Sequence, residues 1–153
     1  MNKYYWVLDA LTELFLKKIE QDNKFNRDEI YNIKDISISV DDIREETELL
    51  ENADDKTLHV LMREAVAELL IKGFCHHPKN DFPYSVRLAE RSEINDFGDL
   101  ILTPTHELLE VYKEIVFDTF KSKVFMTAEE LEKEAARMCR EQIIRAIDDI
   151  YWR

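Results

Sequence analysis

The chain has 153 residues, a formal net charge of -12 and 45% hydrophobic residues, as expected of one globular domain. Its 2 glycines and 3 prolines disfavour glycine-rich phosphate loops and the turn networks of β-sandwiches. It contains no run of roughly 18 apolar residues that could span a membrane, and its start does not resemble a signal peptide. We therefore expect a mostly helical protein with a small β-sheet (α+β), folded as a single domain over residues 1–153.

The first predicted element is a helix over residues 3–22. Apolar side chains recur at helical spacing, and charged side chains occupy the opposite face. The apolar stripe consists of Tyr4, Leu8, Leu11, Phe15 and Ile19. A short helix is expected over residues 27–33.

Residues 35–41 alternate apolar and polar side chains, which predicts a short strand with one apolar face. A helix should follow, because Asp41 or Asp42 can accept hydrogen bonds from the free N–H groups of a first turn. The expected inner face of this helix consists of Ile43, Thr47 and Leu50.

The next helix has the strongest pattern in the chain. Asp54 or Asp55 can cap its start, and Gly73 can supply the left-handed turn that ends it. Its expected core positions are Leu58, Leu61, Met62, Ala65, Leu69 and Ile71.

A β-rich arm should follow this helix. Strands are expected over residues 84–89 and 99–102, joined by a polar loop that contains Gly98. Thr103 and Pro104 then match the cap and first-turn proline that open many helices.

Residues 104–152 should be largely helical, with a capping box at 127–130 that starts the last helix. The aromatic residues at the chain ends are interpreted mainly as core anchors, and alternatively as an interface patch. They are Tyr4, Tyr5, Trp6, Tyr151 and Trp152. The terminal helices could pack on each other or form a homodimer, and the sequence does not choose between these arrangements.

Two segments resemble winged helix-turn-helix proteins. Residues 61–74 end in Leu70, Ile71, Lys72, Gly73 and Phe74, which resembles the leucine, basic residue, glycine and apolar residue with which a winged-helix recognition helix commonly enters the wing. Residues 99–109 are similar to the last wing strand and following helix of MarR-like regulators, with His106 where those proteins have glycine. The resemblance implies a winged-helix-like core over residues 35–110, flanked by helices over 3–22 and 104–152, and a role in binding DNA.

The charge of these segments argues against DNA. Between Asp41 and Asp55 the chain has eight acidic residues and one basic residue, Arg44. The wing region is also acidic, and the cations of the expected recognition helix are offset by glutamates. A DNA-binding surface needs cations that neutralise phosphates, so this field favours cationic proteins and repels nucleic acids and anionic membranes.

No catalytic or metal motif is complete. Adjacent His76 and His77 would point to opposite faces of a strand, and Cys75 and His59 do not complete a ligand spacing. His106 and the following glutamate begin like a zincin motif, but the second histidine is absent. We expect no enzymatic activity, no cofactor and no metal, and we leave the role of Cys75, His76 and His77 open. The absence of a disulfide pattern favours a cytoplasmic location.

The leading hypothesis is therefore a non-enzymatic binding protein. It would be an inhibitor or immunity-type antitoxin that neutralises a basic partner, such as a toxin or a nucleic-acid-binding enzyme. The predicted contact residues are Asp41, Asp42, Glu45, Glu46, Glu48 and Glu51. A simpler interpretation is that this acidic run is a solvated face that aids solubility.

The alternative is a winged-helix transcriptional regulator that binds DNA as a dimer. Such a protein can be acidic overall and basic on one face. The side chains that would contact DNA are Arg63, Lys72, Lys79, Arg87 and Arg91.

Overall fold

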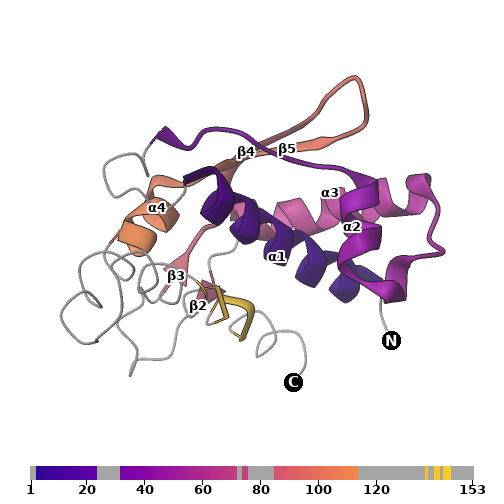
Figure 1. Ribbon diagram of the computed structural model, residues 1–153, viewed down its shortest axis with the longest axis horizontal. Coiled ribbons are helices and arrows are strands. Elements are labelled where there is room, and N and C mark those ends of the chain that lie inside the picture. Colours follow the sequence, from indigo (N-terminus) through magenta and orange to yellow (C-terminus); the bar gives the residue numbers. More distant parts are fainter. Residues whose placement is uncertain are drawn as a thin grey trace.

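A computed structural model describes residues 3–23, 32–71, 74–75, 85–113, 137, 140, 141 and 143–145 (Figure 1). Over these residues the chain is mostly helical with a small antiparallel sheet, so the predicted α+β class is confirmed. The elements are α1 (Lys3–Asn23), β1 (Ile36–Ile38), α2 (Val40–Glu46), the short 3-10 helix η2 (Glu48–Leu50), α3 (Asp55–Ile71), β2 (Phe74–Cys75), β3 (Ser85–Val86), β4 (Ala89–Ile94), β5 (Leu100–Pro104) and α4 (His106–Tyr112).

The main sheet has the strand order β1-β5-β4, so the central strand is the last in sequence. Ile36 lies opposite Leu102, and Ile101 lies opposite Glu93, in antiparallel register. The burial of β5 alternates strictly, because successive side chains point to opposite faces of a strand. Helices α1 and α3 contact each other, β1 contacts α1, and β4 contacts α3, so the two helices cover the buried face of the sheet (Figure 1). Strands β2 and β3 form a separate antiparallel pair.

Helix α1 lies at the centre of the core. The predicted positions Leu8, Leu11, Phe15 and Ile19 are fully buried, whereas Tyr4 is only partly buried. Three further side chains, Val7, Ala10 and Leu16, are also buried because α1 contacts α2, α3 and β1 on several sides. The apolar face is therefore wider than one helical stripe.

The N-terminal cap of α2 is not one of the predicted residues. Ser39, not Asp41 or Asp42, is the N-terminal cap: its hydroxyl accepts a hydrogen bond from the N–H of Asp42 at 3.0 Å. The carboxylate of Asp42 accepts one in return from the N–H of Ser39 at 2.9 Å, which completes a capping box. The strand consequently ends at Ile38, and Val40 is already helical.

Helix α3 follows the prediction more closely. Asp54 accepts a hydrogen bond from the N–H of Thr57 at 2.7 Å, so it is the cap of the two candidates. Leu58, Met62, Ala65 and Leu69 are buried as predicted, Leu61 is partly buried, and Val66 is an additional core residue. Ile71 was expected in the core but is 76% exposed, because it is the last residue of the helix and lies beyond the packed face.

The last strand and α4 are also displaced from their predicted bounds. Pro104 is the final residue of β5, and Thr105 caps α4 by accepting a hydrogen bond from the N–H of Leu108 at 3.1 Å. The prediction that Thr103 and Pro104 open a helix is therefore wrong, and the helix starts at His106. Gly98 lies in the predicted loop with a φ of 81°, in the left-handed region that favours glycine.

A buried charged cluster ties α4 and residue 140 to α1. The carboxylate of Glu20 is hydrogen-bonded to Arg140 and accepts a hydrogen bond from the hydroxyl of Tyr112 at 3.3 Å. Arg140 also lies 3.1 Å from the carboxylate of Glu13. Burial raises the pKa of Glu20 above its ordinary value, although the hydrogen bond from Arg140 opposes this effect.

Several predicted features lie outside the described residues. These are Gly73, the helix over 27–33 except for its last two positions, the helical segment over 114–136 with its capping box, and Tyr151 and Trp152.

Replacing Ser39 by alanine should lower the free energy of unfolding by about 1 kcal/mol, because the first turn of α2 loses its capping hydroxyl. Urea unfolding followed by circular dichroism measures this change. Ser37→Ala is the matched control, since Ser37 is exposed on β1 and contacts Lys18 only through its backbone carbonyl. Equal stabilities of the two variants would contradict the assigned cap.

Candidate protein-binding surface

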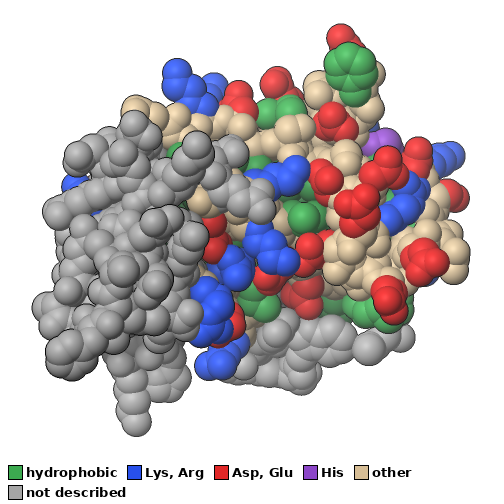
Figure 2. Space-filling model, in the orientation of Figure 1, with side chains coloured by type: hydrophobic (Ala, Val, Ile, Leu, Met, Phe, Trp, Pro, Cys, Tyr) green, Lys and Arg blue, Asp and Glu red, His purple; other side chains and the backbone are tan. Residues whose placement is uncertain are grey.

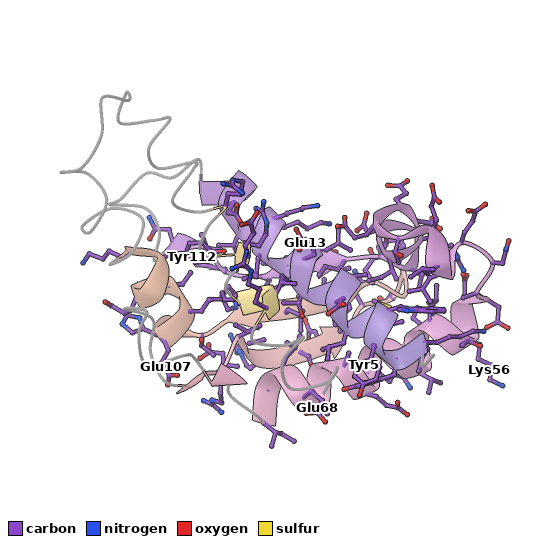
Figure 3. The ribbon with its side chains drawn as sticks, turned by 90° about the horizontal axis from the view of Figure 1, so that it is seen from below. Tyr5, Glu13, Lys56, Glu68, Glu107 and Tyr112 are labelled. Carbon is purple, nitrogen blue, oxygen red and sulfur yellow. The ribbon has the colours of Figure 1, made fainter. Side chains whose placement is uncertain are left out.

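The predicted acidic contact residues all lie on α2, η2 and the loop that leads to α3. Figure 2 shows Asp and Glu side chains gathered over this end of the molecule. Lys56, near the start of α3, lies at the same end, and Glu107 on α4 lies at the opposite end (Figure 3). The acidic run in the sequence is therefore also a local surface feature.

Two lysines of α1 neutralise part of this charge. The ammonium group of Lys18 lies 2.9 Å from the carboxylate of Asp42, and that of Lys17 lies 3.0 Å from the carboxylate of Glu46. Burial alone would raise the pKa of Asp42, but the N–H of Ser39 and the Lys18 ammonium group together lower it below its ordinary value. Asp42 and Glu46 thus help to dock α2 on α1.

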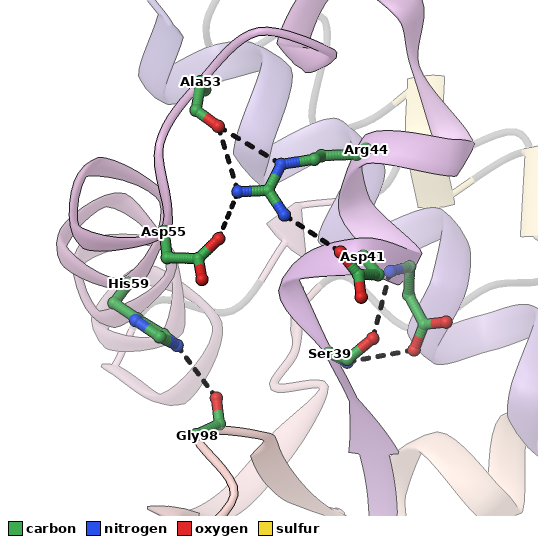
Figure 4. Close-up of polar contacts among 8 residues, drawn as sticks. Ser39, Asp41, Arg44, Ala53, Asp55, His59 and Gly98 are labelled. Atoms are coloured by element: carbon green, nitrogen blue, oxygen red, sulfur yellow. Dashed lines mark hydrogen bonds and ion pairs between the residues drawn. The ribbon is translucent and has the colours of Figure 1, made fainter.

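Arg44 neutralises two more carboxylates and closes the loop between α2 and α3. Its guanidinium group contacts Asp55, lies 2.9 Å from Asp41, and donates to the carbonyl of Ala53 from Nε at 3.2 Å and from Nη2 at 3.0 Å (Figure 4). The hydrogen bond with Asp55 and the charges of both carboxylates raise the pKa of Arg44. A planar guanidinium group has several N–H donors in a fixed arrangement, so it can bond to three separate acceptor groups better than an ammonium group can.

Three of the six predicted contact residues have a carboxylate that is not paired within the described part of the chain. Glu45, Glu48 and Glu51 are exposed, and their carboxylates have no hydrogen bond or ion pair with another described residue. Asp41, Asp42 and Glu46 instead belong to the internal pairs described above. We call Glu45, Glu48 and Glu51 the free acidic patch.

An apolar side chain emerges beside this patch. Leu49 of η2 is 59% exposed, while its neighbour Leu50 is fully buried. A hollow of about 270 Å³ lies between α1 and the α2–η2 segment. Its lining includes four apolar residues, Trp6, Ala10, Leu49 and Ile144, and three acidic residues, Asp9, Glu13 and Glu46. We call this hollow the acidic groove.

The acidic groove explains part of the aromatic cluster at the start of the chain. Tyr4 and Trp6 are partly buried against the core, which agrees with their interpretation as core anchors. Trp6 also lines the groove, so it contributes apolar area to a surface open to solvent. Sequence reasoning did not identify Leu49 or the groove, because both depend on how η2 lies against α1.

The predicted DNA-contacting cations that the structure describes, Arg63, Arg87 and Arg91, lie on three separate segments of the chain. Arg63 is exposed on α3, and Arg91 is exposed on β4. The Arg87 guanidinium donates to the carbonyl of Leu70 at 3.4 Å. Lys72 and Lys79 lie outside the described residues.

The elements that carry these cations are themselves acidic. Helix α3 has three acidic and two basic side chains, and the segment 89–104 that forms β4, its turn and β5 has four acidic and one basic side chain. Phosphate neutralisation needs the opposite balance.

His59 has a structural contact. Its Nε2 lies 2.9 Å from the carbonyl oxygen of Gly98, so this nitrogen carries the proton and donates the hydrogen bond. Among the described residues, no three His, Cys, Asp or Glu side chains cluster as a metal site. The side chain of Cys75 is not described, and His76 and His77 lie outside the described residues.

Comparisons with protein-family models, curated proteins and solved structures give no significant match to this chain. Within its described residues, no helix has the length and apolar character that crossing a lipid bilayer requires.

The Asp42→Asn variant should lose about 0.5–1 kcal/mol of unfolding free energy at neutral pH, because the ion pair and the charged cap are removed. The folded state lowers the pKa of Asp42, so its stabilising effect is complete above the unfolded aspartate pKa of about 3.9. That effect is lost as the pH falls through the folded pKa. The difference between wild type and variant should therefore shrink below about pH 4.

Urea titrations at a series of pH values test this dependence. Asp96→Asn is the control, because Asp96 is exposed in the turn after β4 and forms no ion pair with another described residue. A stability difference for Asp42→Asn that persists unchanged into strong acid would exclude a role for the charge.

Replacing Arg44 by lysine keeps the positive charge but removes the separate guanidinium N–H donors that reach Asp41 and Ala53. The variant should therefore lower the unfolding free energy by roughly 1–2 kcal/mol. Arg63→Lys on the exposed face of α3 is the matched control and should be nearly neutral. Thermal unfolding of both variants provides the measurement. If Arg44→Lys were as stable as Arg63→Lys, the guanidinium geometry would not matter.

Proposed function

We propose that this protein is a non-enzymatic binding protein that inhibits or neutralises a basic protein in the cytoplasm, in the manner of an inhibitor or immunity-type antitoxin. The partner would be a toxin or a nucleic-acid-binding enzyme whose own cationic surface is the target. The observation that carries the proposal is the free acidic patch beside the exposed Leu49 and the acidic groove.

The carboxylates of this segment have two different structural roles, and this difference supports the proposal. Paired Asp42 and Glu46 hold α2 in place, while Glu45, Glu48 and Glu51 remain available on the same segment. A partner's Lys or Arg side chains can reach these three carboxylates without breaking the internal pairs. The cations would meet a surface that is already folded, so little conformational entropy is lost on binding.

The groove adds an apolar contribution to the charged one. Lysine and arginine have aliphatic stems below their charged heads, and the Trp6 and Leu49 side chains that line the hollow are complementary to those stems. The charges would mainly accelerate association, and the apolar lining would slow dissociation.

A winged-helix-like arrangement is our proposal for the scaffold. It is supported by the order of the elements β1, α2, α3, β4 and β5 along the chain, with η2, β2 and β3 between them, and by the sheet order β1-β5-β4, which brings the strand after the wing next to the first strand. The same arrangement is the specific observation that favours the alternative function, a dimeric DNA-binding regulator. The acidic balance of α3 and of β4 with β5 favours protein over DNA as the partner.

The charge-neutralising variant Glu45→Gln/Glu48→Gln/Glu51→Gln should slow association with the basic partner by about tenfold or more at low salt, because steering by the free acidic patch is removed. The partner is first captured from native cell extract on the immobilised chain and identified. Association rates are then measured by surface plasmon resonance over a range of salt concentrations.

The matched control is Glu64→Gln/Glu90→Gln/Glu107→Gln, which removes the same number of exposed carboxylates from other parts of the molecule. Equal rates for the two triple variants would contradict a localised site. Retention of the protein on a duplex-DNA column at physiological salt, lost in Arg63→Ala, would instead support the regulator.

A further inference from the structure

We propose that Phe97, at the tip of the turn between β4 and β5, is the apolar anchor of the same docking surface. It would insert into an apolar pocket of the basic partner that is rimmed by Lys or Arg. This inference rests on the proposed function, which it extends from the free acidic patch to a second contact point.

Phe97 is more exposed than any other large hydrophobic side chain in the described part of the chain. Its exposed fraction is 89%, whereas those of Leu49 and Val60 are 59% and 48%. A phenylalanine buries a large apolar area when it enters a pocket, and buried aromatic anchors dominate many interfaces. The ring contributes almost no packing to the folded structure, because nearly all of it is exposed to solvent.

The turn holds Phe97 in a fixed position. The side-chain oxygen of Asn95 accepts hydrogen bonds from the N–H groups of Phe97 at 3.0 Å and Asp99 at 2.9 Å. The backbone of Asn95 also bonds to Gly98 and Asp99, each at 3.0 Å. A preorganised turn loses little conformational freedom on binding, which is what an anchor requires.

His59 fixes the turn to α3. Its Nε2 donates to the carbonyl of Gly98, and a Cβ at Gly98 would lie 3.4 Å from the same nitrogen (Figure 4). The positive φ of Gly98 and this close approach together disfavour other residues there. The tip therefore cannot swing freely relative to the helix.

The same contacts connect the tip to the acidic segment. His59 is one helical turn from Asp55, Asp55 pairs with Arg44, and Arg44 lies in α2 (Figure 4). In Figure 1 the β4–β5 turn and α2 lie towards the same end of the molecule. One partner surface can thus meet both Phe97 and the free acidic patch.

The charges around Phe97 indicate which kind of partner pocket would receive its ring. Asp96 and Asp99 flank Phe97, and the turn between β4 and β5 contains no cation. A pocket rimmed by carboxylates would be repelled, and so would an anionic membrane surface. A pocket rimmed by Lys or Arg is complementary.

The test uses phage-displayed random peptides selected on the immobilised full-length chain. A selected peptide is then synthesised with a fluorophore and titrated against wild type and variants by fluorescence anisotropy. We expect selected sequences that combine an apolar residue with Lys or Arg. Phe97→Ser should weaken binding by about tenfold or more, because the anchor is lost. Ile71→Ser, which removes an exposed apolar side chain from the far end of α3, should leave the Kd nearly unchanged.

The variants separate this inference from the proposed function. Loss of binding in Glu45→Gln/Glu48→Gln/Glu51→Gln with full binding in Phe97→Ser would overturn the anchor and leave the acidic site in place. Weakened binding in both Phe97→Ser and the triple variant would support the anchor as part of one docking surface, whereas loss in Phe97→Ser alone would overturn that shared surface together with the acidic site. Equal weakening by Phe97→Ser and Ile71→Ser, or selected peptides without cations, would also overturn the anchor.

Discussion

The acidic end of this molecule depends on Arg44. Eight carboxylates between residues 41 and 55 repel one another, and a segment with so much like charge would tend to extend. The guanidinium group of Arg44 offsets this repulsion by pairing with Asp41 and Asp55 and by bonding the Ala53 carbonyl between them. The loop from α2 to α3 is thereby closed around one cation. Glu45, Glu48 and Glu51 can remain unpaired on this segment because Asp41 and Asp55, which are also exposed, are already neutralised.

The parts of the fold that follow a local rule could be predicted from sequence. Helical periodicity located the buried face of α1, and polar-apolar alternation located β1. The errors arose where neighbouring residues compete for one role. Ser39 caps α2 because its backbone is still extended while those of Asp41 and Asp42 are already helical. Ile71 fits the stripe of α3 but is mostly exposed at the helix end, which only the tertiary structure shows.

The candidate site was only half accessible to sequence reasoning. A charge count located the acidic segment, but it could not distinguish Glu46, which pairs with Lys17 on another helix, from Glu45, which is exposed. That difference depends on contacts between residues 29 positions apart. The exposed Leu49 has an apolar neighbour, Leu50, that is buried, and composition treats the two alike. Surface assignments of this kind require knowledge of how α2 and η2 lie on α1.

The exposed side chains of β4 have a consequence for self-association. In the described sheet β4 is an edge strand, so one row of its backbone groups is available for pairing with a strand from another molecule. Residues 90–93 on this strand are all exposed, and the sequence there alternates sign through Glu90, Arg91 and Glu93. Stacking a second copy against this edge would bring charged side chains together and strip them of water. The charged side chains of β4 thus disfavour aggregation through this edge strand.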